Sequence, residues 1–356
     1  MNFTVPYPNP DATQGEAVTS SVTNNSMPIT PNYDDYDERL IYALRIIYMI
    51  GHSLAFLLGT IGNGLVIYFT VFKMKRTVNI VWFLNLAIAD FIFMFVLIFR
   101  IITVALNFHW IFGGFMCRMN DAIFFINLYA SIFLITAISI DRCISVIYPV
   151  WCQNHRTSRL ASYVALAIWI LSFIFSVPYF IFSDTKVIGQ RTVCTYNIDD
   201  QDAVMVIDKN LAISRFIFSF VIPLAVIISC YAIILLRIRR NRIITSKKPF
   251  KIVVAVIIAF FVCWFPLHLF FFLEQSLDYG GNHHLKYVVL IAIPLCKNLA
   301  VINSCINPIL YVFVGRDFKE KFWRSFQSIF ESAFMEEPNQ ATFKSKSRSI
   351  ADSQML

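Results

Sequence analysis

Charged residues are scarce in this sequence, and the motifs of enzymes are missing. Acidic and basic residues together make up 15% of the chain, whereas a soluble domain usually carries about 25%. No hydrolase triad, phosphate-binding loop or metal-ligand spacing is present, so we expect neither an enzyme nor a cofactor. Instead, 58% of the 356 residues are hydrophobic and 36 are phenylalanine. That is more apolar surface than one water-soluble core can bury.

Seven long apolar runs follow one another along the chain. Each is long enough to cross a bilayer, for which about 20 apolar residues suffice. Lipid admits only helices or closed barrels, and the alternating segments of a barrel are absent. We therefore predict an all-α membrane protein with a seven-transmembrane helix bundle. The predicted spans lie near 42–72, 78–104, 115–147, 159–182, 210–238, 249–275 and 286–314.

Lysine and arginine gather in 73–77, 148–159, 237–248 and the tail after the last span, which should all be cytoplasmic. The aspartate-bearing loop 183–208 and the N-terminus should lie outside. The net charge of +8 is thus mainly a topology signal. Because it is scattered over short loops, we expect no nucleic-acid partner. The predicted location is the plasma membrane, with several spans and an extracellular N-terminus.

The chain divides into one membrane domain and its appendages. Residues 1–39 and 335–356 are polar and predicted to be disordered, and 40–314 hold the spans. No signal segment is evident in 1–39, so the first span should direct insertion. Residues 315–334 show an apolar stripe opposite a basic face, which predicts an interfacial amphipathic helix. No internal repeat is visible, which weighs against a transporter.

The outer side should carry covalent modifications. Asn2 and Asn24 stand in glycosylation acceptor patterns, although such short patterns also arise by chance. Of the eight cysteines, only Cys117 and Cys194 reach the predicted oxidising side, so these two can pair. Their bond would tie the 183–208 loop to the outer end of the third span.

Polar residues inside the spans are candidates for function, because charge in hydrocarbon costs several kcal/mol. They occur in the strings GNGLV, LNLAIAD, ISIDRCISV, CWFP and NSCINPILY. Together and in this order, they resemble the rhodopsin-like G-protein-coupled receptors from about residue 42 to 330. The segments 149–157, 107–117 and 303–318 further resemble the chemoattractant cluster that holds formyl-peptide and chemerin receptors, with anaphylatoxin and prostaglandin D2 receptors nearby.

The resemblance assigns roles to the cytoplasmic half. Asp141 would hold Arg142 as a neighbouring ion pair, the activation lock whose opening admits a G protein. Alternatively, Arg142 only anchors a helix end by snorkelling. The matching positions for G-protein coupling are Asp141, Arg142, Tyr231, Asn307, Pro308 and Tyr311.

Two further sets match the middle of the bundle. The sodium pocket of the family corresponds to Asp90, Asn127, Ser131, Asn303 and Ser304. One carboxylate with neutral oxygens suits a monovalent cation, but a purely structural hydrogen-bond cluster is the alternative. The activation switch corresponds to Ile132, Pro223, Phe260 and Trp264. Taken singly, each of these is ordinary core; together they form a group with discrete packings.

The outer halves of the spans hold the candidate ligand-binding residues Arg215, Glu274, Arg100, Asp121 and Lys297. Arg215 lies eight residues from Pro223, about 12 Å along a helix, and is thus well inside the bundle. An unpaired guanidinium there favours a ligand carboxylate. The alternative is an internal salt bridge of Arg215 or Arg100 with Asp121 or Glu274.

Some positions depart from the relatives. Phe125 and Leu211 replace polar residues that formyl-peptide receptors carry, which argues against formyl-methionine as the ligand. Tyr33 and Tyr36 stand among acids and resemble sulfation sites, although the stretch can also be a solvated acidic linker.

The resemblance implies a cell-surface receptor for a peptide chemoattractant, chemerin-like or otherwise bearing a free carboxylate. Its cytoplasmic partners would be an inhibitory-class heterotrimeric G protein, receptor kinases and arrestin. Sodium would be an allosteric modulator. A non-signalling scavenger, a receptor for a lipid mediator of the prostaglandin D2 type, and a transporter or channel are the alternatives.

Overall fold

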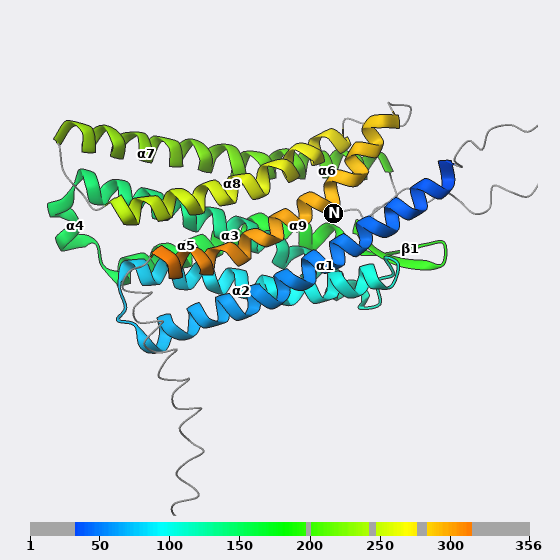
Figure 1. Cartoon of the computed structure of the whole chain (residues 1–356), viewed down its shortest axis with the longest axis horizontal. Coiled ribbons are helices and arrows are strands. Elements are labelled where there is room, and N and C mark those ends of the chain that lie inside the picture. Colours follow the sequence, from blue (N-terminus) through cyan, green and yellow to red (C-terminus); the bar gives the residue numbers. More distant parts are fainter. Residues whose placement is uncertain (1–32, 197–200, 242–246, 276–282, 315–356) are drawn as a thin grey trace, which may run out of the picture.

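Long helices run side by side along the molecule in the computed structural model, which describes residues 33–196, 201–241, 247–275 and 283–314 (Figure 1). The helical elements are α1 (Tyr33–Tyr68), η2 (Phe69–Lys73), α2 (Val78–Ala105), α3 (Gly113–Ile147), α4 (Pro149–His155), α5 (Ser158–Phe182), α6 (Gln201–Phe216), η3 (Ile217–Val221), α7 (Ile222–Asn241), α8 (Lys247–Gln275) and α9 (His283–Val314). The π-helical turn η3 joins α6 and α7 into one continuous helical segment. The bundle therefore consists of seven long helical segments.

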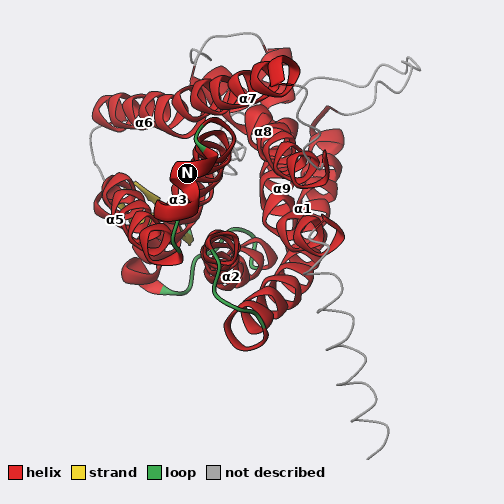
Figure 2. Ribbon diagram, turned by 90° about the vertical axis from the view of Figure 1, so that its left-hand side faces the viewer, coloured by secondary structure: helices red, strands yellow, loops and turns green. Residues whose placement is uncertain are grey.

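The predicted seven-helix bundle is confirmed. Within the described residues, six segments are long and apolar enough to cross a membrane, judged by length and composition. The seventh long helical segment is α9, which packs beside α8 and α1. An end-on view shows α3 inside the ring of the other helices (Figure 2). Among the six candidate membrane spans, α3 has the largest buried share. Residues of α3 therefore contact most of the candidate sites.

A two-stranded antiparallel hairpin, which the all-α prediction missed, caps one end of the bundle. It comprises β1 (Ser183–Ile188) and β2 (Arg191–Tyr196). Gly189 opens the turn with a φ of 60°, a left-handed conformation that glycine adopts without a steric penalty. The predicted disulfide between Cys117 of α3 and Cys194 of β2 is present. We call this the disulfide end, and the opposite end, where α4 lies, the Arg142 end (Figure 1).

The first helix begins earlier than expected. Helix α1 starts at Tyr33, so the last part of the segment 1–39 is helical where disorder was predicted. Four acidic residues lie between positions 33 and 39, and acidic side chains near a helix N-terminus are favourable to the helix dipole. Asn2, Asn24, the rest of the predicted N-terminal disorder, the amphipathic segment 315–334 and the tail 335–356 lie outside the described residues.

Candidate ligand and signalling sites

Arg100 and Asp121 form a buried internal ion pair at the disulfide end. Arg100 donates to Asp121 Oδ1, and the Ser183 hydroxyl donates to Asp121 Oδ2 at 2.8 Å. The Asn120 amide, oriented so that both its atoms are satisfied, accepts from Arg100 Nη2 at 2.7 Å and from Nε at 2.8 Å. For this pair the salt-bridge alternative is therefore correct. The pair joins α2, α3 and β1.

Arg215 has different surroundings. It is 6% exposed, and its Nε is buried without a hydrogen-bond partner. Its guanidinium carbon lies 4.7 Å from the ring centre of Phe271 and 5.6 Å from that of Phe125. No carboxylate among the described residues forms an ion pair with it. The predicted internal bridge of Arg215 is thus absent from the described part of the chain. Aromatic faces and a hydrogen bond with the Tyr179 hydroxyl hold the cation instead.

Lys297 reaches the same aromatic ring from α9. Its Nζ lies 5.9 Å from the centre of Phe271, and the residue is 5% exposed. Glu274, at the exposed end of α8, is the carboxylate that attracts it most strongly. Lys297 and Arg100 also line a cavity of about 20 Å³, room for about one water molecule. Two cations therefore meet at Phe271, and the site favours an anionic partner.

Three residues of the predicted sodium pocket, Asp90, Asn127 and Ser304, form a hydrogen-bonded cluster, and Asn307 joins them. Asp90 is fully buried and accepts from Asn127 Nδ2 at 3.1 Å and from Asn307 Nδ2 at 2.8 Å. Ser304 also donates to it. Asn307, which we had assigned to G-protein coupling, thus belongs to this cluster. Asn303 is buried at 2% exposure, but no described hydrogen bond joins it to Asp90.

Two further buried oxygens belong to residues of the same region of the bundle. The hydroxyl of Ser131 and the amide oxygen of Asn63 are buried without a hydrogen-bond partner in the described structure. The Asn63 amide nitrogen is used, since it donates to the backbone oxygens of Gly59 and Ser304, both at 3.0 Å. These two oxygens are therefore candidate ligands, because buried polar atoms without a partner are costly.

The four switch residues lie in the core as predicted. Ile132, Phe260 and Trp264 belong to one buried cluster, and Pro223 is buried. The rings of Phe260 and Trp264 are stacked, with 5.9 Å between their centres. Pro223 is the second residue after η3, and because proline lacks a backbone N–H, the helix widens there into a π turn.

At the Arg142 end, the structure does not contain the predicted ion pair between Asp141 and Arg142. Asp141 instead binds Arg156, whose Nε and Nη2 each donate to it at 2.8 Å. Arg142 donates to the Asn79 amide oxygen at 2.8 Å, and so does Arg156. Neighbouring residues on a helix do not face each other, whereas Arg156 arrives from the turn after α4. The bond to Asp141 raises the pKa of the Arg156 guanidinium above its usual range.

The remaining coupling residues lie nearby. Tyr231 of α7 is half-buried and interacts electrostatically with Arg142. Pro308 is buried inside α9. Tyr311 lies on the last turns of α9, and Tyr33 and Tyr36 lie on the first turns of α1; their side chains are outside the described set. The sulfation prediction therefore stays a prediction.

Sequence reasoning missed Asn79, Arg156 and Ser183. Asn79 follows the cap of α2 by two residues and carries no span motif. Arg156 was assigned only to membrane orientation, although its charge was a usable signal.

Outside the membrane, Arg118 binds Asp184 of β1, and this bond lowers the pKa of the Asp184 carboxyl.

Comparisons with known proteins agree with this geometry. The model of the family "7 transmembrane receptor (rhodopsin family)" matches residues 62–311. Chemerin-like receptor 1 of Sus scrofa is 41% identical over 323 residues, which cover 85% of this chain and 86% of that protein. N-formyl peptide receptor 3 of Homo sapiens is 38% identical over 90% of this chain and 94% of its own length. The C3a anaphylatoxin chemotactic receptor of Danio rerio is 41% identical, over 86% and 82% respectively.

Proposed function

Because the chain belongs to the rhodopsin family of seven-transmembrane receptors, we propose that it detects a chemoattractant peptide bearing a free carboxylate. The ligand binds at the disulfide end, which faces outside, and a G protein of the inhibitory class binds at the Arg142 end. The similar proteins are named as receptors for chemerin-like, formyl-peptide and C3a ligands. Arrestin and receptor kinases are expected partners of the tail.

The environment of Arg215 is the observation that carries this proposal. A buried guanidinium is costly unless it is paired, and here it faces aromatic rings with its Nε unsatisfied. A ligand carboxylate would pair with the Arg215 guanidinium through two parallel hydrogen bonds. Lys297 on the same ring adds a second attraction.

A row of aromatic rings connects this position with the switch. Phe125, which faces Arg215, lies 5.2 Å from Phe124 between ring centres. Phe124 lies 6.0 Å from Trp264. Ligand binding that favours one packing of these rings shifts the equilibrium toward the G-protein-competent state.

The proposal is tested with paired peptides in cells that express the chain. We expect G-protein dissociation with peptides that end in a free carboxylate. The amidated versions should be at least about tenfold less potent, since a charged hydrogen bond contributes about 1.5–3 kcal/mol. Formyl peptides and prostaglandin D2 complete the panel. Uptake of an active peptide with no G-protein response would contradict signalling and support the scavenger.

We also propose that Asp90, with Ser131, binds a sodium ion that stabilises one state of the receptor. Sodium chloride, compared with choline chloride at equal ionic strength, should raise the unfolding temperature of the purified protein by about 3 °C. Asp90→Asn should abolish this difference. The matched variant Asp208→Asn, which alters a carboxylate on α6, should keep it. An equal sodium effect in both variants would refute the site.

A further inference from the structure

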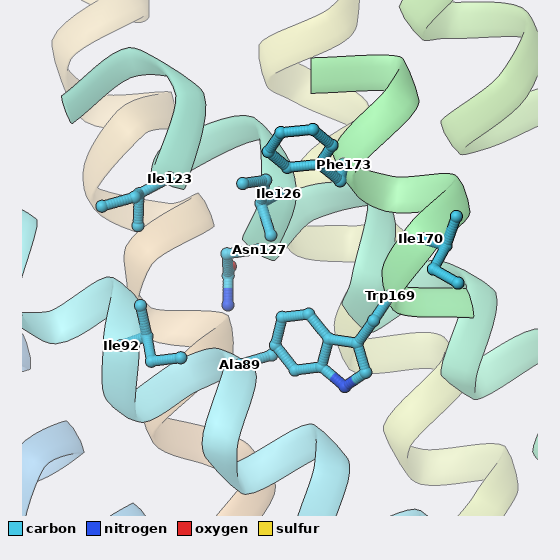
Figure 3. A pocket seen from close by; sticks show the side chains of 8 residues that line it. All are labelled: Ala89, Ile92, Ile123, Ile126, Asn127, Trp169, Ile170 and Phe173. Atoms are coloured by element: carbon cyan, nitrogen blue, oxygen red, sulfur yellow. The ribbon is translucent and has the colours of Figure 1, made fainter. Parts of the chain in front are cut away.

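Two thiols from different helices meet near the Arg142 end of the bundle. Cys143 of α3 and Cys230 of α7 are both free, and they belong to one buried cluster with Ile234. Their side chains are hydrogen-bonded to each other. By contrast, the described residues that line the cavity between α2, α3 and α5 include no thiol, hydroxyl or charged group (Figure 3). The thiol pair therefore offers a chemistry that this cavity lacks.

The pair lies close to the water at the Arg142 end. Cys143 directly follows Arg142, and α3 ends four residues later at Ile147, which is about 6 Å along a helix. Cys230 directly precedes Tyr231, which interacts electrostatically with Arg142. A guanidinium at this level indicates that the hydrocarbon core ends nearby, because charge within it is costly. Hydrogen peroxide, which is uncharged and about as small as water, has only a short distance to cover to the thiols.

We propose that Cys143 and Cys230 form a reversible disulfide when a peroxide oxidises the receptor. The thiolate of one cysteine attacks a peroxide oxygen, the O–O bond breaks, and a sulfenic acid and water form. The second thiol then attacks the sulfenic sulfur, so that the S–S bond forms, the S–O bond breaks and a second water leaves. The two thiols lose two electrons and two protons in all, and hydrogen peroxide becomes two water molecules.

Contact between the two thiols favours this product over its alternatives. A buried cysteine by itself is inert, and its sulfenic acid can be oxidised further to an irreversible sulfinic acid. Here the second thiol is already in place, so the disulfide forms within one molecule at a high effective concentration. A zinc ion requires four ligands, whereas the described residues contain no group of three or more metal-ligating side chains. The pair is therefore suited to a disulfide rather than to a metal.

The disulfide would hold α3 against α7 in the described packing. The coupling residues Arg142 and Tyr231 are the direct neighbours of the two cysteines, and in this packing Arg142 donates to Asn79. A cross-link stabilises the arrangement in which it forms, so oxidation should lower G-protein activation. This consequence rests on the proposed coupling at the Arg142 end, whereas the formation of the disulfide does not.

The experiment treats the whole receptor in lipid nanodiscs with hydrogen peroxide, blocks the remaining thiols and maps disulfide-linked peptides by mass spectrometry. We expect a link between Cys143 and Cys230 that reduced glutathione, a cytosolic reductant, reverses. The unfolding temperature should rise by about 5 °C, because the new bond restricts the unfolded chain. Agonist-independent nucleotide exchange on an inhibitory-class G protein should fall about threefold.

Two serine variants provide the matched control. Cys143→Ser should abolish the link, the rise in unfolding temperature and the loss of nucleotide exchange. Cys152→Ser removes a thiol at the same end, one that donates to Ser145 Oγ at 3.8 Å, and should keep all three effects. Cys143 and Cys230 that stay reduced, or are oxidised separately, in a sample whose Cys152 is oxidised would overturn the disulfide. An equal rise in unfolding temperature in Cys143→Ser would do the same.

The signalling consequence and the proposed function fail in different ways. If the link forms but nucleotide exchange is unchanged, the disulfide does not regulate coupling. If the untreated receptor activates no G protein, the proposed coupling fails, and peptide mapping and the unfolding temperature still decide whether the disulfide forms.

Discussion

Arg215→Ala is expected to reduce the potency of a free-acid peptide agonist about 100-fold while leaving its amidated form nearly unchanged. Truncating one partner of a buried, hydrogen-bonded charge pair costs about 2–5 kcal/mol, and 1.4 kcal/mol corresponds to a factor of ten. The amidated peptide has already lost this pair, so the substitution removes little more from it. The preference for the acid over the amide should therefore collapse. The measurement is a set of dose–response curves for G-protein dissociation at matched surface expression.

Two controls separate the carboxylate contact from other effects. Arg215→Lys keeps the charge but loses the bidentate geometry, and should fall between the wild type and Arg215→Ala. Lys209→Ala removes an exposed cation from the same helix and should change potency by less than about threefold. If Arg215→Ala weakened acid and amide equally, the ligand carboxylate would bind elsewhere and Arg215 would have only a packing role.

Asn79 should control the basal activity, and its two substitutions should act in opposite directions. The Asn79 amide oxygen accepts from both Arg142 and Arg156 and so holds Arg142 against α2. Asn79→Ala removes this acceptor and should raise agonist-independent G-protein activation about fivefold, for a half-buried bond of about 1 kcal/mol. Asn79→Asp places a carboxylate between two guanidinium groups and should lower it.

The control for Asn79 lies at the same end of the bundle. Arg159 is exposed at the start of α5 and forms no described ion pair, so Arg159→Ala should leave the basal signal unchanged. Expression is normalised by surface labelling. A rise in basal activity with Asn79→Asp, or none with Asn79→Ala, would show that the bond to Asn79 does not restrain Arg142.

Much of the candidate site could be predicted because its signals are local in the sequence. A carboxylate in an apolar run, such as Asp90, is recognised from the sequence alone, because the signal does not depend on how the helix packs. The hydrogen-bond and ion-pair partners of the polar side chains were harder to predict. Asp121 is bonded to Arg100 and to Ser183, which lies 62 residues away. Arg156, in the turn after α4, binds Asp141. The prediction paired Asp141 with its neighbour in sequence, although a helix turns adjacent side chains away from each other.

The sequence by itself determined the seven apolar spans and the pairing of Cys117 with Cys194. These follow from transfer free energies and redox chemistry, which depend on residue type and order. Only the tertiary structure decided which arginine is satisfied by a carboxylate and which is not. Arg100 meets Asp121, whereas Arg215 meets aromatic faces. The direction of each side chain depends on helix rotation and packing, and these arise from contacts between distant segments.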